Sequence, residues 1–412
     1  MEFVCFRPLR QVLAVSKTTL IEGGNLGNGW SSLRRKKMIK DQLKNPDFIL
    51  IAVVAAAVVF GVLILSSASA LLSQSKYHDS YYLIRHQFVF GIIPGLIAGM
   101  IAYKIPIRYL RKGAPLLLLV SVILLLLIFV PGVGFSAGGA QRWIHLGFTN
   151  VQPSEVLKPI FIIYLASWLS SRVAGAARRN DKKKELGSTL GAFMVVMGLV
   201  GFLLLKQPDL STFGIIAATA FAMYFLAGTP LRHAFFMIFA GAALLCALVY
   251  FEPYRFERFS SWLSPESDPL GRSFQANQAL ILVGSGGVFG QGFGSSSSKY
   301  NILPELIGDS VFAPYAYEVG FVGCVLLVAI FAVFAWRGFC AARPDQDKFE
   351  YLVASGITIW ITLQAMVNVF STLRLIPLSG VPLPFISYGG TAIAMELAAV
   401  GLLLNISRHR AS

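Results

Sequence analysis

Residues 48–72 read FILIAVVAAAVVFGVLILSSASALL, an uninterrupted apolar stretch without a single charged side chain. A helix needs about 20 mostly apolar residues to cross a bilayer, so this stretch predicts a membrane-spanning helix. Nine further segments of the same kind follow it along the chain. They are Phe88–Ala102, Pro115–Val130, Val156–Ser170, Leu190–Leu205, Phe213–Leu226, Ala234–Phe251, Val311–Trp336, Tyr351–Phe370 and Ile386–Ile406. The sequence therefore predicts an all-α polytopic membrane protein with ten transmembrane helices.

The composition supports this class. Of the 412 residues, 56% are hydrophobic and 13% are charged, whereas soluble domains carry about 25% charged residues. The mean hydropathy of +0.67 excludes a soluble enzyme, a disordered protein and a small disulfide scaffold. The apolar runs are continuous and do not alternate, which argues against a transmembrane β-barrel.

The distribution of positive charge predicts the orientation. If the N-terminus lies inside, 25 Lys and Arg residues fall in inner segments and nine in outer loops, as the positive-inside rule requires. Both termini are then cytoplasmic. Residues 1–46 form a basic tail that we expect to be disordered, and residues 47–408 form the membrane domain. The net charge of +15 is ascribed to inner loops that face anionic lipid, and no nucleic-acid partner is expected.

One outer loop is unusually long. Residues 252–310 separate the seventh and eighth spans, and loops of such length are usually functional or disordered. Aromatic residues in it make disorder the weaker alternative, so the working face is expected outside. The glycine-rich run GSGGVFGQGFG at 284–294 lacks the G-x-G-x-x-G spacing of a nucleotide site. We interpret this run as a flexible re-entrant loop.

Charged residues gather at the expected outer ends of the spans. Arg142, in GGAQRWIHLG, suits either an interfacial anchor or a guanidinium fork for phosphate. Glu155 and Lys158, in QPSEVLKP, are three residues apart and share one helix face, so they form a structural pair, a site pair or both. Asp209, in KQPDLST, is either a helix cap or a site residue.

Two acids lie within expected spans. Glu318 and Glu396 each need a polar partner or a wet cavity, and we expect structural hydrogen bonds, with a proton relay as the alternative. The last outer loop, RLIPLSGVPLPFISYGG at 374–390, contains three prolines and cannot form a regular helix. At membrane depth such a backbone must be buried in protein or line a cavity.

Asp309 ends the long outer loop and precedes the eighth span. Its position suits an N-cap of that helix. It also suits a general base, because a carboxylate there could reach a hydroxyl of a substrate anchored in the membrane surface. From the residues alone, both roles remain open.

Six motifs occur in order along the spans. The chain resembles the SEDS family, which includes the cell-division protein FtsW and the rod-shape protein RodA, over residues 45–410. The loop wording GDSVFA is closer to the division branch. The motifs that carry this resemblance are GGAQRWIHLG, QPSEVLK, QPDLST, NQALILVGSGGVFGQGFG, LPELIGDSVFA and PLSGVPLPFISYGG.

The resemblance implies a peptidoglycan glycosyltransferase. Such an enzyme polymerises lipid II, with a polyprenyl-diphosphate glycan strand as donor, at the outer face of the bacterial cytoplasmic membrane. It works with a class B penicillin-binding protein and other divisome proteins, and a divalent cation, Mg or Mn, is implied by the family alone. Asp309 corresponds to the catalytic aspartate. The implied substrate-binding residues are Arg142, Glu155, Lys158, Gln207 and Asp209, with Gln275, Gln278, Lys299 and Ser387 as further candidates.

Two other functions compete with this one. A lipid II flippase would be favoured by polar residues near the membrane mid-plane and by broken helices, whereas the charges here gather at the outer edge. A non-catalytic scaffold for a penicillin-binding protein is the other alternative, and an intact Asp309 counts against it.

Overall fold

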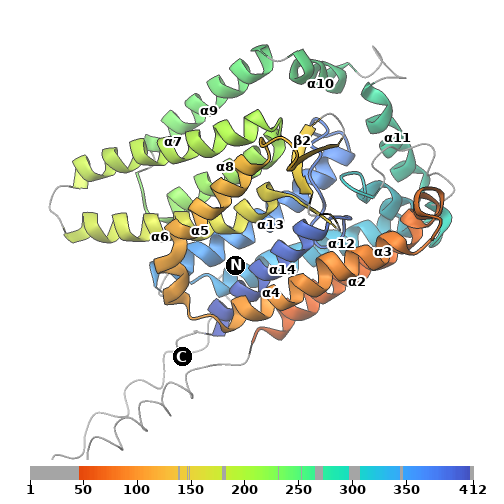
Figure 1. The fold of residues 1–412 in the computed structure, drawn as a ribbon, viewed down its shortest axis with the longest axis horizontal. Helices are drawn as coiled ribbons and strands as arrows, with labels where there is room; N and C mark the ends of the chain where they lie inside the picture. The colour runs from red at the N-terminus through yellow and green to blue at the C-terminus, as the bar shows by residue number, and fades with distance from the viewer. Residues whose placement is uncertain are drawn as a thin grey trace, which may run out of the picture.

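The protein is a bundle of long helices, as the sequence predicts (Figure 1). The computed structural model describes residues 46–137, 140–145, 147, 149–178, 182–230, 232–251, 253–264, 272–296, 307–343 and 347–408. The predicted cytoplasmic tail, apart from its last residue, and the substrate-binding candidate Lys299 lie outside these residues.

The helices follow the apolar segments closely. Between the seventh and eighth expected spans, two additional helices, α10 and α11, occupy much of the long loop. The elements are α2 (Phe48–Tyr77), α3 (Tyr82–Gln87), a π-helical turn η1 (Phe88–Ile92), α4 (Ile93–Lys104), α5 (Ile107–Leu127), α6 (Pro153–Arg178), α7 (Lys182–Lys206), α8 (Leu210–Leu226), α9 (Arg232–Phe251), α10 (Pro253–Leu263), α11 (Arg272–Ser285), α12 (Phe312–Ala341), α13 (Lys348–Thr372) and α14 (Gly390–Arg408).

The protein is a multi-pass membrane protein. Within the described part of the chain, eight helices are long and apolar enough to cross a membrane, one of them being the continuous stretch α3–η1–α4. Helix α8 is apolar but has only 17 residues, and α6 carries Glu155 and Lys158 near its start. These two helices correspond to the remaining expected spans, and the count of ten stays a prediction.

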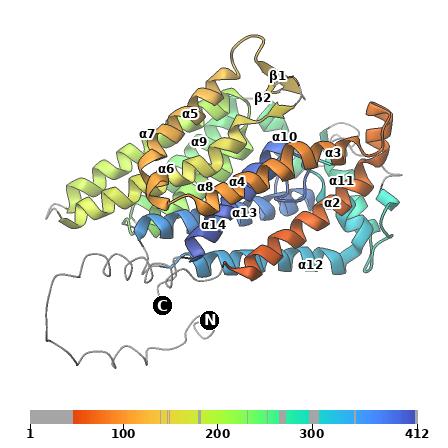
Figure 2. The same ribbon diagram turned by 60° about the horizontal axis from the view of Figure 1, so that its bottom comes forward.

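A small sheet connects α5 to α6, although the sequence indicated helices alone. Strands β1 (Gly134–Ala137), β2 (Ala140–His145) and β3 (Asn150–Val151) pair antiparallel in the order β1-β2-β3. Figure 2 shows β1 and β2 at the top, beyond the end of α5. The Gln141 side chain donates to the Ile128 carbonyl at 2.9 Å and thereby ties β2 to the end of α5. Pairing satisfies backbone groups that a short irregular loop would leave open.

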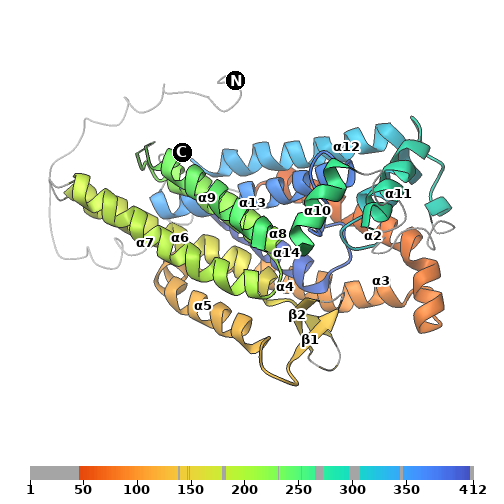
Figure 3. The ribbon, with the colours of Figure 1, turned by 90° about the horizontal axis from the view of Figure 1, so that it is seen from above.

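Helix α13 lies at the centre of the bundle. It packs against α6, α8, α12 and α14, and Figure 3 shows it between α12 and the pair α6–α7. In its most apolar stretch 72% is buried inside the protein, against 11% for α9. Peripheral helices therefore turn apolar side chains such as Phe235 and Phe239 outward, as expected for lipid-facing surfaces.

Ion pairs connect several helices at the end of the bundle where α2 begins. Asp47 caps α2 and lies 2.5 Å from Arg337 near the end of α12. Arg111, near the start of α5, lies 3.2 Å from Asp347, the cap of α13. The other end of the bundle carries the strands, the turn before α8 and the start of α12. The two ends of the bundle are thus built from different sets of residues.

Helix α12 is broken at Gly320, whose φ is +68°. The glycine-rich run lies across this break: the Gln291 and Gly292 N–H groups donate to the Tyr317 and Glu318 carbonyls. On the other side, the Phe321 N–H donates to Gly287. The run is therefore held by backbone hydrogen bonds, and the interpretation as a flexible loop is wrong. The backbone of the run supplies the hydrogen-bond partners that the broken helix cannot supply itself.

The expected structural role of Glu318 is confirmed at the same place. Its carboxylate accepts hydrogen bonds from the hydroxyls of Ser67 and Ser296 and from the Ser296 N–H at 3.3 Å. A buried acid in a span needs such partners. Glu318 thus joins α2, α12 and the chain that follows the glycine-rich run.

Gly290→Ala tests this close approach, and we expect a clear loss of stability. A Cβ at Gly290 would lie 2.1 Å from the Glu318 carbonyl oxygen, and the backbone there has φ +83°. Gly292→Ala is the matched control, because Gly292 has φ +91° with open space around it. Both variants carry the left-handed strain of about 1–3 kcal/mol, and only Gly290→Ala adds the clash. Unfolding temperatures in detergent that are equal for the two variants would contradict this packing.

Candidate functional site

Two buried amides on α13 organise the candidate site. Gln364 Oε1 accepts from Lys158 Nζ at 2.8 Å and from Trp360 Nε1 at 2.9 Å. Gln364 Nε2 donates to Glu396 Oε1 at 3.2 Å and to the Pro382 carbonyl at 3.1 Å. One side chain therefore connects α6, α13, α14 and the proline-rich segment 374–389.

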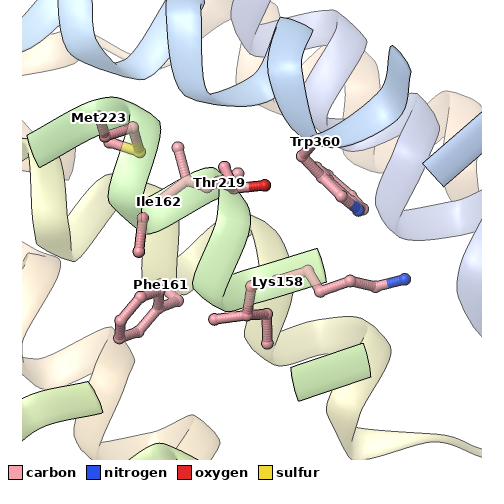
Figure 4. Close-up of a pocket in the computed structure, with 8 residues that line it drawn as sticks. Lys158, Phe161, Ile162, Thr219, Met223 and Trp360 are labelled. Atoms are coloured by element: carbon pink, nitrogen blue, oxygen red, sulfur yellow. The ribbon is translucent and has the colours of Figure 1, made fainter. Parts of the chain in front are cut away.

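Glu155 and Lys158 form the pair that their spacing predicted. Glu155 Oε2 lies 2.7 Å from Lys158 Nζ, and each side chain is only 2% exposed. Lys158 also lies 5.3 Å from the centre of the Trp360 ring, close enough for a cation–π interaction. Figure 4 shows Lys158 and Trp360 turning their nitrogen atoms to the same side of a small, mainly apolar pocket. The Lys158 ammonium is thus shared among buried partners.

Glu396 fastens the proline-rich segment to α14. Its Oε2 accepts from the Phe385 N–H at 2.8 Å, and its Oε1 accepts from Gln364. This confirms the expectation of structural hydrogen bonds for Glu396. The segment is buried in protein at Val381, Leu383 and Phe385, as the bilayer requires of an irregular backbone.

The turn that carries Asp309 rests on this segment. Asn368, one turn after Gln364, donates from Nδ2 to the carbonyls of Asp309 and Val381, both at 2.7 Å. Ser387 Oγ donates to the Gly308 carbonyl at 2.6 Å, and the Tyr388 N–H donates to Ile307 at 2.9 Å. The backbone of the turn is thus held at three consecutive carbonyls, those of residues 307 to 309. The predicted site residue Ser387 thus acts on the position of this turn.

The Asp309 side chain is half-buried and faces the same segment. A Cβ added to Gly380 would lie 3.5 Å from Asp309 Oδ2, and the hydroxyl of Ser310 lies 3.5 Å from Oδ1. The alternative role of Asp309 as a helix cap is wrong. Helix α12 begins at Phe312, its N-cap is Val311, and no side chain caps it. Asp309 lies within a turn at residues 307–311 that precedes the helix, which the sequence did not reveal.

Asp209 and Arg142 connect the other predicted residues. Asp209 caps α8, one of the two roles that the sequence left open: it accepts from the Thr212 N–H at 3.3 Å, and its second oxygen accepts from Ser154 Oγ at 3.2 Å. Arg142 Nε donates to the Gln207 carbonyl at 3.2 Å, and its Nη2 donates to Pro208. Arg142 therefore holds the turn between α7 and α8. Through Asp209 and Ser154 this turn adjoins the start of α6.

The predicted glutamines have different surroundings. Gln207 is 1% exposed and donates to the Leu125 carbonyl at 3.0 Å, so it lies within the bundle. Gln275 on α11 donates to Ser310 Oγ at 3.2 Å, which places it beside the turn of Asp309. Gln278 lies three residues further along α11 and is half-buried. Of the three, Gln275 is connected to the candidate catalytic residue.

The sequence did not single out Gln364 and Asn368, although they hold the site together. Both are fully buried on α13. They are spaced four residues apart in a span, and uncharged amides at that spacing share one helix face. Polar side chains in a membrane helix are functional suspects, so this pattern was the available signal.

The divalent cation that the resemblance implies has no protein-built site among the described residues. Among the residues that the structure describes, no group of three or more His, Cys, Asp and Glu side chains is arranged to hold a metal ion. Magnesium is often bound by one or two carboxylates together with substrate phosphates, and Asp309 alone does not make a centre. The cation stays a prediction.

Comparisons with known proteins agree on one family. Residues 47–412 match the model of the family described as cell cycle protein, FtsW/RodA/SpoVE. The chain is 37% identical to the stage V sporulation protein E of Bacillus subtilis, over 89% of this chain and 98% of that protein. It is 35% identical to the probable peptidoglycan glycosyltransferase FtsW of Trichlorobacter lovleyi, over 89% of this chain and 94% of that one.

Solved structures show the same fold. One is described as "Structural coordination of polymerization and crosslinking by a peptidoglycan synthase complex"; it has a TM-score of 0.72 and 29% identity, and the match covers 88% of this chain and 98% of that one. The rod shape determining protein RodA of Thermus thermophilus has a TM-score of 0.63 and 27% identity, with 89% and 98% covered. With a matching family model over nearly the whole membrane domain, the chain belongs to the FtsW/RodA/SpoVE family of cell cycle proteins.

Proposed function

We propose that this protein is a peptidoglycan glycosyltransferase that polymerises lipid II at the outer face of the bacterial cytoplasmic membrane. The observation that carries the proposal is the partly exposed Asp309 carboxylate on a turn fixed by Asn368 and Ser387. A general base needs a fixed backbone and an accessible carboxylate. Relatives named as probable peptidoglycan glycosyltransferases support the same reaction.

The reaction joins two lipid-anchored sugars. The growing strand on its polyprenyl diphosphate is the donor, and the 4-hydroxyl of the GlcNAc unit in lipid II is the acceptor. Asp309 takes the proton of this hydroxyl while the hydroxyl oxygen attacks the anomeric carbon of the donor. The bond from that carbon to the diphosphate breaks, and polyprenyl diphosphate leaves. The base then loses its proton to water.

Lys158 acts as a positioning residue in this mechanism. Its ammonium is buried between Glu155, Gln364 and the Trp360 ring, and exposing it would leave Glu155 buried without its partner. Its contact with Gln364 instead supports the segment on which Asp309 rests. Arg142 is partly exposed while it holds the turn before Asp209, so its remaining donor capacity could serve a phosphate.

A class B penicillin-binding protein is the partner that we propose. One structural neighbour is described as a synthase complex that coordinates polymerization with crosslinking, and a crosslinking enzyme would act on the strands made here. The FtsW names among the relatives favour a role in cell division with other divisome proteins. The protein's place in the bacterial cytoplasmic membrane and its cytoplasmic termini belong to the same proposal.

The flippase alternative draws on the break in α12. Broken helices mark many transporters, and Gly320 interrupts a membrane helix. The glycine-rich run, however, makes backbone hydrogen bonds to both sides of this break. These bonds favour a break that is a fixed part of the fold over one that moves during transport.

Cysteine labelling tests the proposed orientation. In a background without the four native cysteines, Ser264→Cys should react with an impermeant thiol reagent in intact spheroplasts, because the loop that contains α10 is outside. Ser171→Cys, exposed on α6, should react only after permeabilisation. The reverse pattern would place Asp309 inside the cell and contradict the proposed site.

The activity itself is tested with purified components. The protein, alone and with its penicillin-binding partner, is incubated with fluorescent lipid II, and products are separated on a gel. We expect a ladder of glycan polymers. If only unreacted lipid II remains under both conditions, although the protein is folded and binds the lipid, the glycosyltransferase proposal fails.

A further inference from the structure

A second pocket, which is polar, lies close to the turn of Asp309. It has a volume of about 200 Å³ and lies between α10, α11 and the residues at and after the end of α13. Figure 1 shows α10 and α11 together at the upper right of the protein. The polar side chains that line it are Arg258, Ser261, Trp262, Ser273, Gln275, Ser371 and Arg374. Among these described lining residues two are cationic and none is acidic.

Arg374 is held toward this pocket by several contacts. Its Nη1 donates to Asn277 Oδ1 at 2.6 Å and its Nη2 to the Trp262 carbonyl at 3.5 Å. The Trp262 indole N–H donates in return to the Arg374 carbonyl at 2.9 Å. Arg374 has φ +59°, a left-handed conformation that L-residues rarely adopt. Helices α10 and α11 are thus joined to the end of α13 around one guanidinium.

Gln275 connects the pocket to the candidate base. It lines the pocket and also donates to Ser310 Oγ at 3.2 Å. Ser310 follows Asp309 and lies 3.5 Å from its carboxylate. A group bound in the pocket would therefore lie next to the turn that carries Asp309.

The chemistry of the lining selects an anion. Guanidinium groups bind phosphate and carboxylate through paired hydrogen bonds, and the serine hydroxyls and the Gln275 amide supply further donors. The volume is below the roughly 300–1,000 Å³ of sites for drug-sized ligands. It suits one ionised group with its neighbouring sugar atoms better than a whole disaccharide-peptide headgroup.

We propose that this two-arginine pocket binds an ionised oxyacid group of the saccharide substrate, either its diphosphate or a carboxylate, and so aligns the sugar with Asp309. The inference rests on the proposed glycosyltransferase function for the identity of the substrate. Arg258, which lies on α10, and Arg374, which lies in the segment after α13, are then substrate-binding residues. Neither was among the site residues that the sequence indicated.

The test measures initial polymerisation rates against lipid II concentration for Arg258→Gln and Arg374→Gln. Each variant should raise KM by about 10-fold or more, since hydrogen bonds to charged groups are worth about 1.5–3 kcal/mol, and should change kcat about 2-fold or less. Arg85→Gln is the matched control, because Arg85 is 68% exposed and pairs with Asp79 away from the pocket. Arg374→Lys keeps the charge without the fork and should fall between wild type and Arg374→Gln.

Two further arms separate the sources of the anion. Lipid II with amidated stem carboxylates should abolish the difference between the variants and wild type if a carboxylate is bound. If that difference persists and inorganic diphosphate competes with wild type more strongly than with the variants, the diphosphate is bound. Unfolding temperatures identify any variant whose fold is weakened, and Arg258→Gln, which removes none of the Arg374 contacts, then decides.

The outcome does not depend on turnover alone. Binding of labelled lipid II is measured on the same variants without polymerisation. Weaker binding by both Gln variants supports the pocket even if wild type forms no polymer, in which case only the glycosyltransferase proposal fails. Wild-type KM and unchanged lipid II binding in both folded variants would overturn the pocket proposal and leave the proposed function intact.

Discussion

Asp309→Asn should lower lipid II polymerisation by about 10²–10⁴-fold, the usual contribution of a general base. The amide keeps the size of the side chain but cannot accept the proton of the attacking hydroxyl. The fold should be unaffected, because Val311 occupies the N-cap position of α12 and no side chain makes a capping hydrogen bond to this helix. Rates on fluorescent lipid II, measured beside unfolding temperatures, separate the loss of chemistry from a loss of structure.

Asp79→Asn provides the matched control for this variant. Asp79 lies in the turn between α2 and α3 and pairs with Arg85 at the surface, where ion pairs contribute about 0–1 kcal/mol. It should polymerise at the wild-type rate. An Asp309→Asn protein that matches Asp79→Asn in rate would remove Asp309 from the chemistry, and the flippase and scaffold alternatives would regain weight.

Lys158→Met should destabilise the protein by about 3–5 kcal/mol, the cost of breaking a buried ion pair from one side. The change leaves the Glu155 carboxylate, 2% exposed, without its cation, and it removes a donor from Gln364. Activity should fall along with stability, since Gln364 supports the segment under Asp309. Thermal unfolding in detergent measures the loss of stability.

The double variant Glu155→Gln/Lys158→Met isolates the cause. Removing both charges eliminates the unpaired carboxylate, so stability should recover by a large part of the loss. Ser171→Ala, a change on the exposed part of α6, is the control and should be neutral. The stability loss of the double variant is compared with the summed losses of the single variants Glu155→Gln and Lys158→Met. If the two values are equal, the pair makes no stabilising interaction and the positioning role of Lys158 fails.

Features that depend on local sequence were predictable. The apolar run at 48–72 became α2, because hydropathy alone decides which segments enter a membrane. Glu155 and Lys158 paired because residues three apart share a helix face. Asp209 caps α8 because a short polar turn precedes that helix.

Features that depend on distant contacts were not predictable. Asp309 has the sequence position of a cap, yet a turn held by Asn368 and Ser387, some 60–80 residues away, keeps it off the helix. The glycine-rich run looked like a flexible loop because its partners lie across the break at Gly320. Gln364 was overlooked because three of its four partners lie on other elements, which no periodicity in the sequence reveals.

The most direct test of the glycosyltransferase proposal counts products in proteoliposomes that contain this protein as their sole enzyme. Lipid II is supplied only on the side where α10 and α11 are exposed, and both released polyprenyl diphosphate and new sugar–sugar bonds are measured. The mechanism predicts one diphosphate released for each bond, with chains that lengthen over time, and neither product from Asp309→Asn. Transfer of lipid II across the membrane by the wild-type protein, with no diphosphate released and no polymer formed, would contradict it.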